Sequence, residues 1–179
     1  MSSWKALFRY AAVLLAVALV TSCIKDEHEE ADATTLVSVG QAAPDFTVEM
    51  LDGQRIRLSD LRGDVVLLSF WDPQCPTCEQ LMEVSVERIV KRIAGNDIHY
   101  LPISRGYTRQ YIEEYCASHG YDFPVGLDTQ KAIYSLYASK YVPRTFLIDK
   151  RGIIRHLYVE YDLATLPTIL SAAESLAEE

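Results

Sequence analysis

Apolar residues along the chain follow two different spacings, and the shorter one predicts β-strands. Residues 65–71, VVLLSFW, form an almost unbroken apolar run, which is typical of a central strand buried on both faces. Two shorter segments, 46–50 and 54–58, flank a turn at 51–53 and predict a hairpin. Three further strands are expected, at 98–104, 145–149 and 153–160.

The longer spacing, near 3.6 residues, predicts helices between and after these strands. It runs from Cys75 to about Ala94, and Gly95 is a suitable helix end. Three other helices are expected, at 108–119, 128–141 and 163–177. This order of elements predicts an α/β fold, with a central mixed β-sheet flanked by helices and an N-terminal β-hairpin extension.

The first 22 residues have the pattern of a targeting signal. Lys5 and Arg9 precede an apolar run at 11–20 that is short for a membrane span. Cys23 follows two small residues, which resembles a bacterial lipoprotein signal, although Val20 stands where leucine is usual. We expect a signal peptide at 1–22 and lipid attachment at Cys23. The alternative is an ordinary secretory signal followed by a chance cysteine.

Residues 23–36 are acidic and carry few apolar side chains, so they predict a flexible tether. Within it, residues 25–27 resemble signals that send some lipoproteins to the outer cell surface, but the sequence favours a solvated charge run as their explanation. The remaining residues, 37–179, have the length of one domain. The net charge of −8 becomes more negative by two when Lys5 and Arg9 are removed, which argues against a nucleic-acid partner.

Cys75 and Cys78 stand two residues apart, after the buried strand and at the predicted start of a helix. The loop that they would close is too short to staple a domain, because the benefit of a disulfide grows with loop length. A zinc site needs four ligands, and the four histidines are isolated from one another. We therefore expect no metal and no bound cofactor, and redox chemistry is the remaining interpretation of the pair.

Three landmarks together resemble the thioredoxin fold, and within it the membrane-tethered thiol–disulfide oxidoreductases of the TlpA/ResA type in the AhpC/TSA-redoxin superfamily. They are APDF at 43–46, FW followed by CPTC at 70–78, and YVPRTFLIDKRG at 141–152. The resemblance runs from about residue 40 to residue 176. It implies an enzyme that reduces or exchanges disulfides in exported proteins of the cell envelope. Its partners would be protein thiols and disulfides and an upstream electron donor, with the lipid anchor holding it at the membrane on the periplasmic side or at the cell surface.

The chemistry of disulfide exchange assigns a role to each residue of the motif. Cys75, at the helix start, would be the attacking thiolate, since free backbone N–H groups and the helix dipole stabilise negative charge there. Cys78, one turn further on, would resolve the mixed disulfide. Pro76 and Thr77 lie between them and are expected to tune the reduction potential of the pair and to contact the substrate. The resemblance further implies a cis Pro143, with Val142 presenting its backbone to an extended substrate.

Several positions depart from the pattern of these families. Ser69 stands where thioredoxins usually place a buried aspartate, and Leu81 stands where many TlpA/ResA-like proteins place a glutamate. Gln74 replaces the usual tryptophan before the first cysteine. Asp72 and Pro73 stand where these families have an alanine followed by a variable residue. The familiar proton relay is therefore absent or relocated, and Asp72 is a candidate for a local electrostatic role.

Cys116, His119 and Arg144 also carry reactive or charged side chains. Cys116 is expected to be a buried, inert thiol on an apolar helix face. His119 is expected to cap the end of its helix. Arg144 could place its charge beside the Cys75 thiolate or point into solvent, and the sequence favours neither.

Two other functions remain open on the sequence. A peroxiredoxin-like peroxidase shares the fold and the APDF opening, and Pro73 and Thr77 fit its motif, but Gln80 occupies the position of its cysteine. A non-enzymatic binding module could use the same scaffold, although the intact CPTC argues against it.

Overall fold

The continuous apolar run at 65–71 is the central strand β3, Val65–Trp71, and all seven of its residues are buried. It pairs in parallel with β4, Ile98–Arg105, and antiparallel with β6, Arg144–Ile148. A strand flanked on both sides and covered on both faces must be apolar on both faces, which explains the absence of alternation in this segment.

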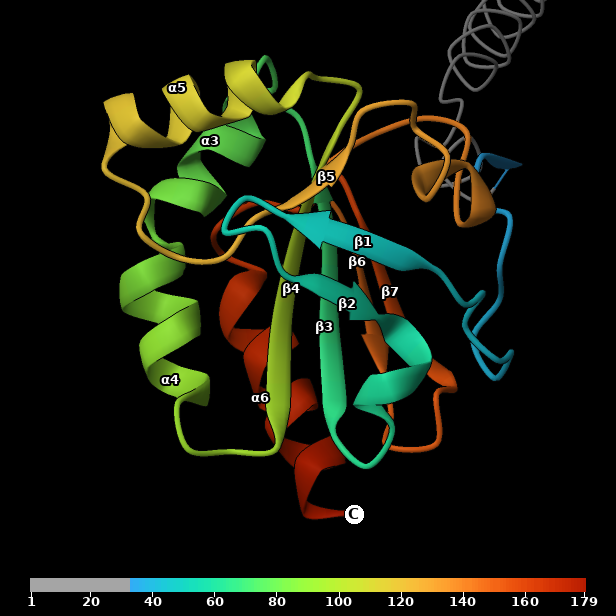
Figure 1. Ribbon diagram of the computed structural model, residues 1–179. Coiled ribbons are helices and arrows are strands. Elements are labelled where there is room, and N and C mark those ends of the chain that lie inside the picture. Colours follow the sequence, from blue (N-terminus) through green and yellow to red (C-terminus); the bar gives the residue numbers. More distant parts are fainter. Residues whose placement is uncertain (1–32) are drawn as a thin grey trace, which may run out of the picture. The chain divides into compact units, whose positions relative to one another are not determined.

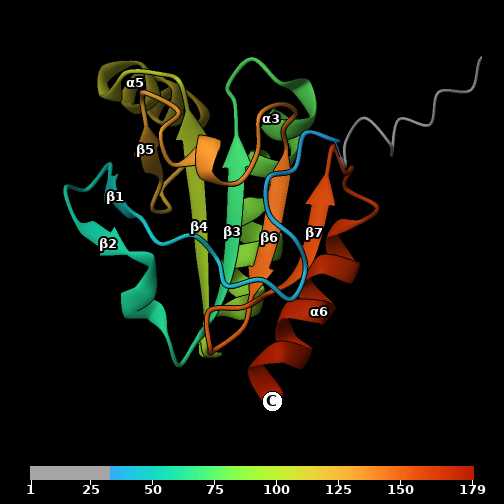
Figure 2. The same ribbon diagram turned by 90° about the vertical axis from the view of Figure 1, so that its right-hand side faces the viewer.

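A seven-stranded mixed sheet surrounds β3, in the order β2-β1-β5-β4-β3-β6-β7 (Figures 1 and 2). The predicted hairpin forms β1, Thr47–Met50, and β2, Arg55–Arg57, at one edge. The predicted C-terminal strand is β7, Ile154–Val159, at the other edge. The predicted fold class, a thioredoxin-like mixed sheet with an N-terminal hairpin extension, is confirmed.

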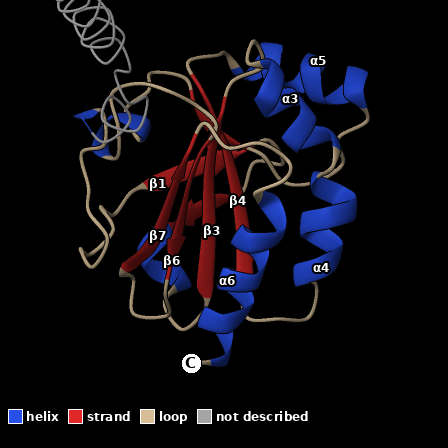
Figure 3. Ribbon diagram, turned by 180° about the vertical axis from the view of Figure 1, so that it is seen from behind, coloured by secondary structure: helices blue, strands red, loops and turns tan. Residues whose placement is uncertain are grey.

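The helices α3 to α6 lie on one face of the sheet, as the view from behind shows (Figure 3). The predicted helix 75–94 comprises α3, Pro76–Glu83, a π-helical segment, Ser85–Val90, and α4, Lys91–Ile93. The hydroxyl of Ser85 donates to the carbonyl of Leu81 at 2.7 Å, a type of back-bonding that often bends helices. The other two helices are α5, Arg109–His119, and α6, Leu166–Glu178.

The two faces of β3 contribute side chains to two different hydrophobic clusters, because successive side chains of a strand point in opposite directions. Val65 and Leu67 pack against α4 and α6, in a cluster that contains Ile93 and Ile169. On the opposite face, a second cluster gathers residues from the N-terminal segment, β1, β4 and β6. Its members include Val37, Phe46, Val48, Phe70, Leu101, Tyr134, Tyr137 and Phe146.

The predicted helix at 128–141 is wrong. The chain there forms a short strand, β5, Gly126–Asp128, and then a single 3₁₀ turn, Tyr134–Leu136. The carboxylate of Asp128 accepts the backbone N–H groups of Ile133 and Tyr134, at 3.2 and 2.7 Å. This side-chain bonding offers the backbone an alternative to a helical ladder, and the apolar residues of the segment pack as a loop.

The structure is a computed structural model that describes residues 33–179, and the folded unit within it is Thr34–Glu179. The predicted signal peptide, Cys23 and most of the predicted tether lie outside the described residues. Thr34 and Thr35 already bond to the guanidinium of Arg144, at 2.9 and 2.6 Å, so the folded unit begins three residues before position 37. Among the described residues, no helix has the length and hydropathy to span a membrane.

Candidate functional site

Cys75 lies where β3 gives way to α3, and it is the residue that caps this helix. Its sulfur accepts the backbone N–H of Cys78 at 3.2 Å, as a capping side chain does. Pro76 follows at the first helical position, where its missing N–H would have had no partner in the helix. Cys75 is partly exposed, so solvent can reach it. Its position at the helix N-terminus also favours a negatively charged thiolate.

Cys78 differs from Cys75 in burial, since its exposed fraction is zero. Removal from water raises the pKa of the Cys78 thiol far above its usual range, and its hydrogen bond with Cys75 raises it further. Both cysteines are free thiols in this structure. The pair therefore consists of an accessible sulfur and a shielded one, as expected for two thiols with different tasks.

The loop before β6 supplies a second side of the site. The Val142–Pro143 peptide bond is cis, as predicted. The thiol of Cys75 lies 3.5 Å from the carbonyl oxygen of Val142, which it contacts as a hydrogen-bond donor. Two segments separated by 67 residues thus meet at one sulfur. Pro76 is exposed and Thr77 half-buried beside them.

A group of hydroxyls occupies the position where thioredoxins carry a buried carboxylate. The hydroxyl of Ser69 lies 2.8 Å from that of Thr145, its neighbour on β6, and Thr145 lies 2.7 Å from the hydroxyl of Tyr161. Burial raises the pKa of Tyr161, and the hydrogen bond to Thr145 only partly offsets this. The interior below the cysteines therefore offers neutral donors and acceptors at these three residues, and Leu81 is buried and apolar.

Arg144 is fully buried, so it neither points into solvent nor lies beside the thiolate as the sequence allowed. Side chains alternate along β6, and Thr145 faces the cysteine side of the sheet, so Arg144 faces the other side. There its guanidinium donates to Thr34, Thr35 and the carbonyl of Lys140. The same residue that follows the cis proline thus anchors the start of the folded unit.

Cys116 and His119 have the environments that the sequence predicted. Cys116 is 5% exposed in a cluster with Trp71 and Met82, and burial raises its pKa to about 11. At neutral pH this thiol is protonated and unreactive. His119 lies in the last turn of α5, where its Nδ1 is 2.8 Å from the carbonyl oxygen of Tyr115. Its ring also stacks on Tyr115, with centroids 4.1 Å apart.

The last residue of β4 and the loop that follows it contribute side chains that sequence reasoning missed. Tyr107 donates its hydroxyl to Oδ1 of Asp72 at 2.9 Å, and Nε of Arg105 lies 4.0 Å from Oδ2 of the same carboxylate. Neither residue belongs to a motif, and Asp72 and Tyr107 are 35 positions apart in the sequence, which hides their proximity. Only the pairing of β3 with β4 places the ends of these strands next to each other.

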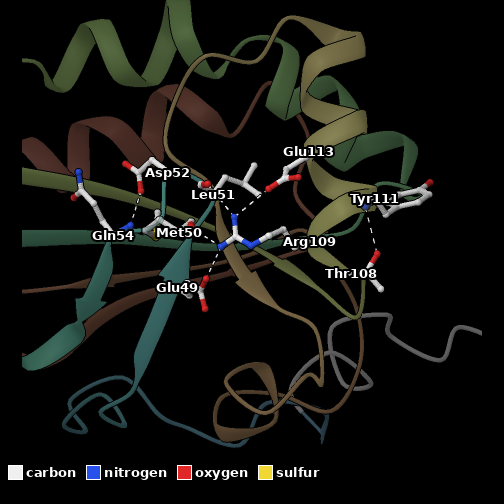
Figure 4. A network of polar contacts seen from close by, with 9 residues as sticks. All are labelled: Glu49, Met50, Leu51, Asp52, Gln54, Thr108, Arg109, Tyr111 and Glu113. Carbon is white, nitrogen blue, oxygen red and sulfur yellow. Dashed lines mark hydrogen bonds and ion pairs between the residues drawn. The ribbon is translucent and has the colours of Figure 1, made fainter.

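Arg109 fixes the far end of this loop. Its guanidinium donates to the carbonyls of Met50 and Leu51, at 3.0 and 2.9 Å, and to the carboxylate of Glu49 at 2.6 Å (Figure 4). The first turn of α5 is thereby tied to the end of β1. The N-terminal hairpin extension thus supports the loop that reaches Asp72.

A central mixed sheet with an accessible dithiol at a helix start and a cis proline opposite defines the class of thioredoxin-like thiol–disulfide oxidoreductases. The protein belongs to the AhpC/TSA family, whose model matches residues 39–157. Within the described residues, no group of three or more histidine, cysteine, aspartate or glutamate side chains could hold a metal ion.

Individual relatives agree with this class. The chain is 35% identical over 123 residues to the thiol-disulfide oxidoreductase ResA of Geobacillus kaustophilus, covering 69% of this chain and 70% of the relative. A Bacteroides thetaiotaomicron protein, provisionally assigned as a protein disulfide isomerase, superposes with a TM-score of 0.76 at 30% identity, over 82% and 94% of the two chains. StoA of Bacillus subtilis shares the fold, with a TM-score of 0.62 at 17% identity over 72% and 96%. The chain is a ResA-like oxidoreductase of the thioredoxin fold.

Proposed function

We propose that the protein exchanges disulfides with exported proteins through the Cys75–Cys78 pair and a mixed-disulfide intermediate. The Cys75 thiolate attacks a substrate disulfide, forming one new S–S bond and releasing the other substrate sulfur as a thiolate that takes up a proton. Cys78 then loses its proton and attacks Cys75. The Cys75–Cys78 disulfide forms, and the second substrate sulfur leaves with a proton.

The contrast between the two sulfurs carries this proposal. Cys75 is accessible and receives an N–H donor at the helix start, whereas Cys78 is fully buried and its thiol is strongly disfavoured from ionising. An attacking thiol must reach its substrate as a thiolate, whereas a resolving thiol needs to reach only its neighbour. The arrangement therefore supports Cys75 as the nucleophile and Cys78 as the resolving residue.

Substrate would lie across the accessible side of Cys75. We assign the backbone of Val142, next to Pro143, to pairing with an extended substrate segment, because its carbonyl already lies 3.5 Å from the Cys75 sulfur. Pro76, exposed at the first turn of α3, and Thr77 would contact the substrate from the helix side. The pair itself carries the two electrons, so no further cofactor enters the scheme, and an upstream donor restores the dithiol.

Replacing Cys78 with serine should trap substrate proteins on Cys75 as mixed disulfides. The variant keeps its nucleophile and loses the residue that releases the substrate. Cells are quenched with acid, proteins are separated without reductant, and trapped partners are identified by mass spectrometry. Cys116→Ser is the matched control and should trap nothing. Equal trapping by Cys75→Ser and Cys78→Ser would refute the assignment of roles.

The lipid anchor is the second part of the proposal, and it rests on residues 20–23 of the sequence. A lipidated Cys23 would hold the domain at a membrane of the cell envelope, on the periplasmic side or at the cell surface. Cys23→Ser should move the protein from the membrane fraction to the soluble fraction, as measured by immunoblotting after ultracentrifugation. Continued sedimentation of the variant with membranes would contradict lipid attachment at this cysteine.

A further inference from the structure

Asp72 contacts both cysteines through its backbone. Its carbonyl accepts the N–H of Cys75 at 3.1 Å, and its own N–H bonds to the sulfur of Cys78. Whatever fixes Asp72 therefore also fixes the geometry of the pair. Its side chain brings a carboxylate to a position where these families usually have none.

This carboxylate is held in one place. Oδ1 accepts two hydrogen bonds of 2.9 Å, one from the hydroxyl of Tyr107 and one from the backbone N–H of Gln74. Only 18% of the Asp72 side chain is exposed. Burial and the bond to Asp72 together raise the pKa of Tyr107 to about 12, so this tyrosine remains a neutral donor at neutral pH. A fixed and poorly solvated charge acts on its neighbours with little screening by salt.

Arg105 is the opposing charge. Its Nε lies 4.0 Å from Oδ2 of Asp72, and its side chain is 16% exposed. Its guanidinium lies over the ring of Tyr134, with Cζ 4.5 Å from the ring centroid. Nε of Arg105 is buried without a hydrogen-bond partner among the described residues, and the carboxylate of Asp72 lies 4.0 Å from it. The two side chains form a largely buried charge pair at the ends of β3 and β4, and the backbone of Asp72 links this pair to both cysteines.

We propose that this pair of charges sets the redox equilibrium of Cys75 and Cys78, with Asp72 favouring the disulfide and Arg105 favouring the dithiol. A negative charge opposes thiolate formation, and a reduced pair gains stability from its thiolate. Asp72 therefore makes the protein a stronger reductant, and Arg105 limits that effect. This inference rests on the proposed function and names the two charges that adjust the redox equilibrium of its site.

The other titratable groups around the pair are unchanged by the substitutions proposed below. Tyr100 and Tyr161 act on Cys78 from the interior, and burial raises the pKa of each. Glu79 on α3 lies 3.5 Å from Nε2 of His119 on α5. Because these groups are common to all variants, differences between the variants report on Asp72 and Arg105.

The test is equilibration with glutathione. One protein dithiol and one glutathione disulfide give one protein disulfide and two glutathione thiols, so two electrons and two protons move to glutathione. At about pH 8.5, where thiols ionise, Asp72→Asn should shift the equilibrium towards the dithiol by about tenfold, equivalent to about 30 mV. Arg105→Gln should shift it the other way. At about pH 5 both variants should approach the parent, because thiols are then protonated.

Asp60→Asn, which removes an exposed carboxylate, is the matched control and should leave the equilibrium unchanged. A purely structural role for the loop would move Asp72→Asn and Arg105→Gln in the same direction at every pH, and that result would overturn the proposal. A shift of less than about twofold in the equilibrium of Asp72→Asn would overturn the proposal as well, because the expected shift is about tenfold. If Arg105→Gln does not fold, Tyr107→Phe replaces it. Tyr107→Phe keeps the charge of Asp72 and removes its hydrogen bond, so Asp72→Asn made in this variant should still shift the equilibrium towards the dithiol.

The proposed function fails by a different observation. If Cys75 and Cys78 do not form a disulfide with each other under oxidising glutathione, as checked by peptide mass mapping, the redox role itself is wrong. If they do form it and the charge variants have no effect, only the role of Asp72 and Arg105 is wrong.

Discussion

Cys75→Ser should abolish the catalysed part of insulin-disulfide reduction, so that the rate falls to that of the chemical reductant alone. A serine hydroxyl does not ionise near neutral pH, so the attacking species is lost while the helix cap is retained. The assay follows insulin precipitation with dithiothreitol as the electron source. The buried sulfur of Cys78 cannot substitute, because its exposed fraction is zero and it does not reach the substrate.

Two controls make this result specific. Cys116→Ser should retain the parent rate, because its thiol is buried and burial holds its pKa at about 11. Hydrogen peroxide consumption measured on the same samples separates the peroxidase alternative, in which the parent would consume peroxide rapidly. A Cys75→Ser variant that still reduces insulin faster than the reductant alone would refute Cys75 as the nucleophile.

Phe70→Ala should lower the free energy of unfolding by about 3–5 kcal/mol. Phe70 is fully buried on the face of β3 opposite the cysteines, and its ring lies 5.2 Å from Tyr134, 5.6 Å from Tyr137 and 6.3 Å from Phe146, centroid to centroid. The substitution leaves a cavity where three rings converge, and a close-packed core relaxes only partly around it. Urea denaturation followed by far-UV circular dichroism measures the loss.

Matched substitutions distinguish the cavity from a general effect. Phe70→Leu keeps most of the volume and should cost clearly less than alanine. Leu136→Ala removes a side chain that is 43% exposed and should change the free energy of unfolding by well under half of the Phe70→Ala effect. A Phe70→Ala variant as stable as the Leu136→Ala variant would show that this aromatic cluster does not support the fold.

Local patterns predicted most elements because their local and tertiary preferences agree. The apolar run at 65–71 could be satisfied only by a strand covered on both faces. The hydroxyl of Thr108 caps α5, and Gly120, which has no side chain, ends it with a φ of 69°, as these residue types suggest. The segment 128–141 misled the prediction because the bonds of Asp128 to Ile133 and Tyr134 compete with a helix and have no signature in hydrophobic spacing.

The sequence by itself determined the two thiols, their position at a helix start and the proline opposite them, because each depends on chain neighbours or on a motif. The tertiary structure decided the direction of Arg144, which follows from strand alternation and from the threonines that reach its guanidinium. It also decided which charges surround the pair. Asp72, Arg105 and Tyr107 come together only because β3 and β4 run in parallel and end at the same edge, a long-range pairing that no local spacing encodes.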